Sequence, residues 1–124
     1  MKVLAALLVL LSASAASAEL RTRPPRKVRC ELFTDRDFAG ERLPIPDGGG
    51  ADFGSGAIGS TAFRHHGDFW NDQVSSARVP QGCTLRVYEH ELGQGEEKAW
   101  SGVNVRYVGD RWNDRISSAR CSCN

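Results

Sequence analysis

A ten-residue phrase occurs twice in this chain, and the repeat limits the folds that the chain can adopt. It is WNDQVSSARV at 70–79 and WNDRISSARC at 112–121, 42 residues later. Seven of the ten positions are identical, and Val74 and Ile116 exchange one β-branched apolar residue for another. Repetition with a period of a few tens of residues is the usual sign of a duplicated supersecondary unit. The chain is therefore predicted to contain two copies of one small unit.

A similar hairpin sequence precedes each phrase, at 30–43 and at 85–100. The two hairpins align on one glycine each, and the aligned pairs are Gly40 with Gly95, Phe33 with Tyr88, Thr34 with Glu89 and Glu41 with Glu96. Between that glycine and the tryptophan of the phrase, the first copy has 13 more residues than the second. Residues 46–59, PDGGGADFGSGAIG, hold this surplus. Their glycines predict a surface loop without a regular element.

Short alternating apolar segments with turn residues between them predict an all-β fold. The expected strands are 28–33, 40–45, 60–64, 76–80, 84–89, 96–100, 103–107 and 118–122. Four antiparallel strands with one long return connection form a Greek key, and two such units can close one core. We expect a single domain over 28–124, a sandwich of about eight antiparallel strands with one Greek key at about 28–80 and the other at about 83–123.

The N-terminal segment indicates export. Residues 1–18 combine one lysine, a nine-residue apolar run and small residues before position 19, which predicts a signal peptide cleaved after Ala18. The run is too short to span a membrane, so we expect a secreted or periplasmic monomer. Residues 19–27 are expected to form a flexible basic arm. Without Lys2 the chain has 15 basic and 15 acidic residues, and this balance argues against a nucleic-acid partner.

Four cysteines lie in the exported part, and an even number in a small exported protein favours disulfides. They are Cys30, Cys83, Cys121 and Cys123. Three pairings are possible. Because a Cys121–Cys123 bond would close a very tight ring, we expect Cys30 and Cys83 each to bond to one of the C-terminal pair. A zinc site is disfavoured because the paired spacing of structural zinc ligands is missing.

Within N-D-x-x-S-S, every specified side chain is short and presents oxygen. These residues are Asn71, Asp72, Ser75 and Ser76, then Asn113, Asp114, Ser117 and Ser118. Oxygen ligands without nitrogen or sulfur suit a hard cation such as Ca²⁺. The same residue types also form ordinary turns. Two near-identical copies, each after a matching hairpin, favour metal binding over turns alone.

The chain resembles the calcium-binding type of the βγ-crystallin superfamily, whose signature is Asn/Asp-Asn/Asp-x-x-Ser/Thr-Ser after a tryptophan. The signature stands as NDQVSS at 71–76 and NDRISS at 113–118, and Phe33, Phe38 and Gly40 match the hairpin pattern, whereas Gly93 takes the second aromatic position of the other copy. The resemblance implies a two-motif sandwich that holds two Ca²⁺ ions in a double clamp. Each ion is then held by a hairpin carbonyl, by a backbone carbonyl and a serine hydroxyl of one signature, and by an Asn or Asp side chain of the other.

Carried onto this chain, the resemblance implies eight metal ligands. They are Thr34, Asp72, Gln73, Ser75, Glu89, Asp114, Arg115 and Ser117, of which Gln73 and Arg115 would supply backbone oxygen only. In the family, the last serine of each signature more often ties the bend to the folded hairpin.

Functions other than calcium binding have less support in the sequence. His65 and His66 are adjacent on an expected strand and would point to opposite faces, and no catalytic or phosphate-binding motif is present, so we expect no enzyme. The tryptophans are expected to pack rather than to stack on a sugar. The resemblance also implies an alternative, an exported effector that binds a protein, such as a metalloproteinase inhibitor or a killer toxin. Its contact would be the loop at 46–59 or the disulfide-held C terminus.

Overall fold

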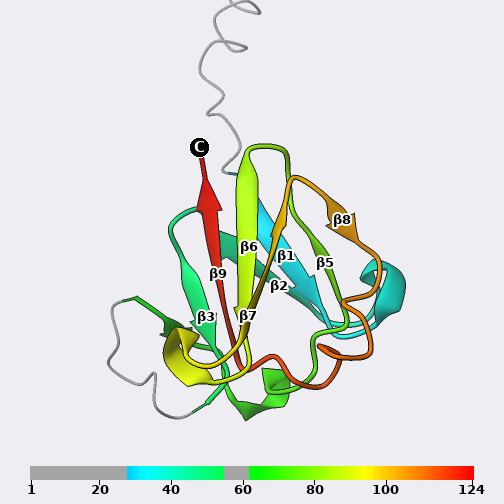
Figure 1. Cartoon of the computed structure of the whole chain (residues 1–124), viewed down its shortest axis with the longest axis vertical. Helices are drawn as coiled ribbons and strands as arrows, with labels where there is room; N and C mark the ends of the chain where they lie inside the picture. Colours follow the sequence, from blue (N-terminus) through cyan, green and yellow to red (C-terminus); the bar gives the residue numbers. More distant parts are fainter. Residues whose placement is uncertain (1–27, 55–61) are drawn as a thin grey trace, which may run out of the picture.

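The computed structural model describes residues 28–54 and 62–124, and these form a sandwich of two β-sheets (Figure 1). The predicted signal peptide at 1–18 and basic arm at 19–27 lie outside the described residues. The strands are β1 (Arg29–Phe33), β2 (Arg42–Pro46), β3 (Gly50–Asp52), β4 (Arg64–His65), β5 (Ser76–Arg78), β6 (Cys83–Tyr88), β7 (Glu97–Ser101), β8 (Asn104–Val105) and β9 (Ser118–Cys123). Three short 3₁₀ turns, η1 (Arg36–Phe38), η3 (Asp68–Trp70) and η4 (Glu91–Gly93), connect them.

The two sheets exchange one strand between the repeated units. One sheet has the order β2-β1-β5-β8 and the other β4-β3-β9-β6-β7. β3 comes from the first unit but pairs with β9 of the second, and β8 comes from the second unit but pairs with β5 of the first. The prediction of an all-β sandwich is confirmed. The described residues form nine strands rather than about eight, and one pair among them, β3 with β4, is parallel.

The alternation of buried and more exposed side chains along β6 shows how a strand of this sheet contributes to the core. In β6, Cys83, Leu85 and Val87 are buried, whereas Arg86 between them is exposed. Side chains of a strand point alternately to the two faces of the sheet, so one face of β6 enters the core. Apolar residues of both sheets and of the segments beside their strands complete the core, among them Leu32, Ile45, Phe53, Val74, Val79, Ile116 and Ala119.

Two disulfides attach the last strand to the rest of the fold. Cys30 of β1 bonds to Cys121 of β9 and so links the two sheets, and Cys83 of β6 bonds to Cys123 within one sheet. The expectation that Cys30 and Cys83 each bond to one C-terminal cysteine is confirmed. A disulfide typically stabilises a fold by about 2–4 kcal/mol, mainly by restricting the unfolded chain.

The prediction of a surface loop over 46–59 is wrong for residues 50–54. Gly50 to Asp52 form β3, and Gly50 to Gly54 are all buried. A Cβ atom on Gly50 would lie 2.6 Å from the carbonyl oxygen of Ala62, so glycine here permits close packing of strands. These buried residues cannot serve as the expected contact with another protein. The strand expected at 60–64 is observed as β4 at Arg64–His65, and residues 55–61 lie outside the described part.

The two folded hairpins share one backbone pattern. In the first, the N–H of Thr34 donates to Glu41 O and that of Asp35 to Ala39 O; in the second, Glu89 N–H donates to Glu96 O and His90 N–H to Gln94 O. The alignment made on Gly40 and Gly95 therefore holds in three dimensions. Within the described ranges, no helix is long and apolar enough to cross a membrane.

Candidate metal centre

The two signature bends lie in direct contact. The Asp72 N–H donates to the carbonyl oxygen of Ile116 at 3.1 Å, and the Ser75 hydroxyl donates to Oδ1 of Asn113 at 2.8 Å. Both bends lie at the end of the sandwich opposite the C terminus (Figure 1). Residues 42 positions apart in the sequence are therefore available to one site.

Each bend is fixed by buried neighbours on both sides of its acidic residue. Trp70 and Trp112 are buried, as expected of packing residues, and Val74 and Ile116 are buried in the core. The backbone between them turns back, since Gln73 N–H donates to Trp70 O and Arg115 N–H to Trp112 O. Asp72 and Asp114 have φ of 58° and 63°, a left-handed conformation that aspartate tolerates better than most residues.

The last serine of each signature ties its bend to the neighbouring folded hairpin. Ser76 Oγ donates to Asp35 O and accepts the N–H of Phe38. Ser118 Oγ donates to His90 O and accepts the N–H of Gly93. Both serines are fully buried. These two serines link each bend to its hairpin, and both hydroxyl oxygens already take part in hydrogen bonds within the protein.

The preceding serine of each signature brings its bend beside a hairpin ligand candidate. Ser75 N–H donates to Phe33 O at 2.9 Å, and Ser117 N–H donates to Tyr88 O at 3.0 Å. Thr34 and Glu89 directly follow these two acceptors. Each hairpin position therefore lies next to the bend of its own unit, which is the neighbourhood that a clamp requires.

One set of the expected ligands lines a common surface hollow. Asp72 of the first bend meets Glu89, Asp114, Arg115 and Ser117, together with His90. Ser75, of the other set, does not line this hollow. It is buried and its hydroxyl is bonded to Asn113, and Thr34 Oγ1 accepts the N–H of Glu41.

The electrostatics of this hollow favour a cation. The pKa of Asp72 is raised above its usual value, first by burial and then by the nearby negative charge of Asp114. Glu89 adds a third carboxylate, which has His90 Nε2 3.5 Å away. Carboxylates that repel one another at a partly buried site are stabilised when a bound cation neutralises them.

Two residues at this site were not among the predicted ligands. Asn113 accepts the hydroxyl bond of Ser75, and His90 lines the hollow. Asn113 is part of the repeated phrase, so the repeat could have indicated that this residue contributes to the site. His90 follows the hairpin residue Glu89, and no motif in the sequence distinguishes it.

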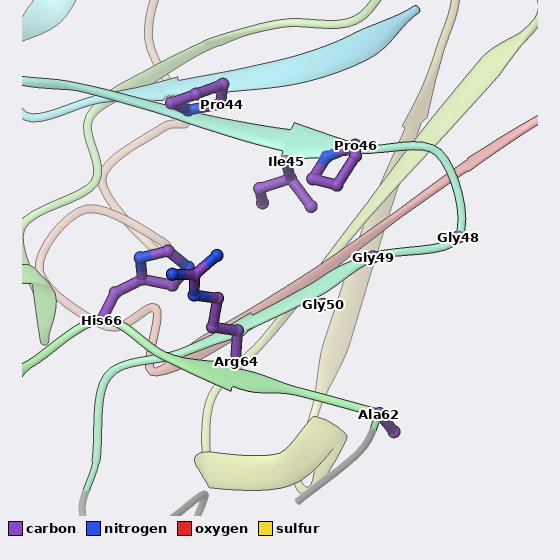
Figure 2. A pocket seen from close by; sticks show the side chains of 9 residues that line it. All are labelled: Pro44, Ile45, Pro46, Gly48, Gly49, Gly50, Ala62, Arg64 and His66. Carbon is purple, nitrogen blue, oxygen red and sulfur yellow. The ribbon is translucent and has the colours of Figure 1, made fainter. Parts of the chain in front are cut away.

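His66 lines a second hollow, between β2 and β4 (Figure 2). Arg64 and His66 project from the β4 side toward Pro44 and Ile45. His65 is the last residue of β4, which pairs with β3 at the edge of the sheet, and both His65 and His66 are half-buried. Burial, followed by the charge of Arg64, lowers the pKa of His66.

Comparison with known proteins identifies the fold. No protein-family model matches the chain, and no curated protein matches it. A double mutant of a βγ-crystallin domain from Clostridium beijerinckii matches with a TM-score of 0.59 at 23% identity, covering 77% of this chain and 97% of that chain. The N-terminal domain of Protein S matches with a TM-score of 0.58 at 21% identity, covering 77% of this chain and 97% of that chain.

Two further structures agree. A βγ-crystallin domain from Flavobacterium johnsoniae has a TM-score of 0.57 at 22% identity, covering 77% of this chain and 94% of that chain. A double mutant of clostrillin, solved in complex with nickel, has a TM-score of 0.59 at 21% identity, covering 77% of this chain and 98% of that chain. Likeness at this level of identity establishes a shared architecture, and the chain therefore has the βγ-crystallin fold.

Proposed function

We propose that this chain is an exported domain that binds Ca²⁺ between its two signature bends. The observation that carries the proposal is the hollow in which Asp72 and Asp114, from different copies of the repeat, meet Glu89 and Ser117. A pair of acidic side chains brought together from two bends, one of them with a raised pKa, is unfavourable without a cation.

The residues present fit calcium. One ion would be held by the carbonyl oxygens of Glu89 and Arg115, the hydroxyl of Ser117 and the carboxylate of Asp72. A second would be held by the corresponding set, which is Thr34, Gln73, Ser75 and Asp114. Every proposed donor is a hard oxygen, as Ca²⁺ prefers, and waters would complete a shell of 6–8 ligands.

The proposed role of the ion is to stabilise the fold. At free calcium about 100 times the dissociation constant, one site contributes about 2.7 kcal/mol. A domain of this size has a total stability of about 5–15 kcal/mol. The two disulfides already restrict the unfolded chain, so we expect the calcium-free protein to remain folded and to unfold at a lower temperature.

Calorimetric titration of the purified exported chain with calcium tests the proposal. We expect saturable binding in the unmutated protein and weaker binding in Asp72→Ala and in Asp114→Ala. Glu97→Ala, which removes an exposed carboxylate on β7, is the matched control and should bind as the unmutated protein does. If the unmutated protein shows no binding at millimolar calcium, the proposal is wrong.

A further inference from the structure

The outer face of the five-stranded sheet carries two arginines side by side. Arg86 of β6 lies directly opposite Arg120 of β9 in the antiparallel register, and both side chains are exposed. Like charges at directly opposed positions of a sheet destabilise it. The pair therefore calls for a negatively charged partner.

The protein itself supplies little compensation. Arg86 Nη1 lies 3.4 Å from Glu97 Oε2, and both side chains are about half exposed, so the ion pair is weak. Arg120 forms no ion pair with another described residue; its guanidinium lies 5.6 Å from the ring centroid of Phe63. A cation–π contact of this kind does not use the N–H donors of the guanidinium, so they stay available to a ligand.

Hydroxyl groups extend the same surface. Thr84 is opposed by Ser122 on one side and by Ser101 on the other, and Thr84 Oγ1 lies 2.8 Å from Ser101 Oγ. Thr84, Arg86, Tyr88, Arg120 and Ser122 line one hollow beside Gly48. On either side of the arginine pair the opposed residues are small, Gly50 on β3 and Ala99 on β7, which leaves room over the strands.

We propose that this hollow binds the sulfate or phosphate group of an acidic ligand between Arg86 and Arg120. Guanidinium groups offer paired N–H donors that match the oxygens of a tetrahedral oxyanion, and charge-assisted bonds of this kind are the stronger ones. The hydroxyls of Thr84 and Ser122 add neutral donors at the same level of the sheet. The site requires no calcium, because it is built from strands β6 and β9 and not from the two bends.

The first experiment uses inorganic sulfate and inorganic phosphate as probes at constant ionic strength, with chloride as the balancing anion. Backbone amide signals of the full exported chain are followed by NMR during each titration. We expect saturable shifts in β6 and β9 with a dissociation constant in the millimolar range, and about tenfold weaker binding in Arg86→Gln and in Arg120→Gln. Arg42→Gln is the matched control, since Arg42 lies on the other sheet and is paired with Glu31 at 2.5 Å.

The second experiment separates the two sources of the oxyanion. A sulfated disaccharide and a soluble phosphate monoester are titrated under the same conditions, and the tighter of the two identifies the ligand class. The inference is overturned if neither inorganic ion gives saturable shifts in β6 and β9, or if Arg42→Gln weakens binding as much as the two hollow variants do. Calcium titration of Arg86→Gln should match that of the unmutated protein, so failure here leaves the calcium proposal standing.

Discussion

The two copies of the repeated bend have nearly the same backbone and different side-chain surroundings. The backbone bonds repeat one for one, as with Ser75 N–H to Phe33 O and Ser117 N–H to Tyr88 O. The surroundings differ, because the Ser75 hydroxyl is buried against Asn113, whereas Ser117 lines the open hollow. The repeated units thus share the bonds that build the fold, whereas the surroundings of the two proposed ion sites differ.

The hairpins show the same divergence at their tips. In the first, the Phe38 ring lies 5.9 Å from that of Phe33, and Arg78 lies 4.6 Å over it. In the second, Gly93 replaces the aromatic residue, and a Cβ atom there would lie 3.0 Å from the ring of Phe63. A phenylalanine from the connection of the first unit therefore fills the space that the second unit leaves empty.

The charges near the two proposed sites are also unequal. Glu89 brings a carboxylate to the second hairpin, where the first has Thr34. Asp72, which would serve the site of Glu89, is half-buried, whereas Asp114 is exposed. More negative charge and less solvent screening strengthen attraction for a cation. We therefore expect the site with Glu89, Arg115 and Ser117 to bind calcium more tightly than the site with Thr34, Gln73 and Ser75.

The largest expected effect is a loss of stability when the buried serine of either unit is removed. It tests whether the two bends are held to their hairpins equally strongly. Ser76→Ala and Ser118→Ala each leave one N–H and one carbonyl without their partner, at a cost of about 2–3 kcal/mol. Urea denaturation of the calcium-free protein measures both. Ser101→Ala, at an exposed serine, is the control and should cost less than about 0.5 kcal/mol. Clearly unequal losses for the two buried serines would break the equivalence.

The next effect concerns the two aspartates and sharpens the difference between the sites. Asp72→Asn should weaken the tighter calcium-binding step by about tenfold, or about 1.4 kcal/mol, because it removes the charge from the more negative site. Asp114→Asn should act mainly on the weaker step. Calorimetry that resolves two steps measures this, and an equal effect of both changes on both steps would contradict the ranking.

A smaller effect is expected from a change of pH, which should act in opposite directions on the stability of the calcium-free protein and on calcium affinity. The pKa of Asp72 is raised in the folded protein above that of the unfolded chain, so the charged carboxylate costs stability above the raised pKa. As the pH falls through that pKa, the calcium-free protein should gain stability while calcium affinity falls. Thermal unfolding at a series of pH values, with and without calcium, measures both slopes. Asp72→Asn should flatten both, and slopes that survive in this variant would assign the titration to another group.

The smallest expected effect is on calcium affinity when the side chain of Arg115 is changed, because only the backbone carbonyl of this residue is proposed to bind the ion. Arg115 is proposed to bind through its carbonyl, while its exposed cationic side chain lies beside the hollow. Arg115→Gln should therefore bind calcium about two- to threefold more tightly, a change below about 1 kcal/mol. Gln73→Arg, at the equivalent position of the first bend, is the reciprocal variant and should weaken its own site. Weaker binding in Arg115→Gln would show that the side chain supports the site.

Much of this architecture could be predicted from the repeated phrase. The matched hairpins and the short alternating apolar segments around it indicated the sandwich. The spacing of Cys121 and Cys123 indicated that Cys30 and Cys83 each bond to one of them, but not which bonds to which. Strand β3 was not predicted, because glycine and alanine have low β-sheet propensity. Small residues are needed at Gly50 and Ala51 because the strand packs closely against Phe63 and pairs with β9. Local sequence preference does not report such tertiary demands.

The candidate site could also be predicted only in part from the sequence. The signature marked Asp72 and Asp114, and it also marked the serines. It did not show that Ser75 and Ser117 differ, because Asn113 approaches only one of them through tertiary contact. Likewise Arg86 and Arg120 lie 34 residues apart and become neighbours only through the register of β6 and β9.

The two disulfides have a consequence for proteolysis of the chain. Cys30 is joined to Cys121 and Cys83 to Cys123, so the bonds enclose almost the whole sandwich. A protease that cuts the chain once at any point between Cys30 and Cys123 leaves two fragments that remain covalently attached. A single cleavage therefore releases no fragment of this region, and the nicked molecule can keep its shape.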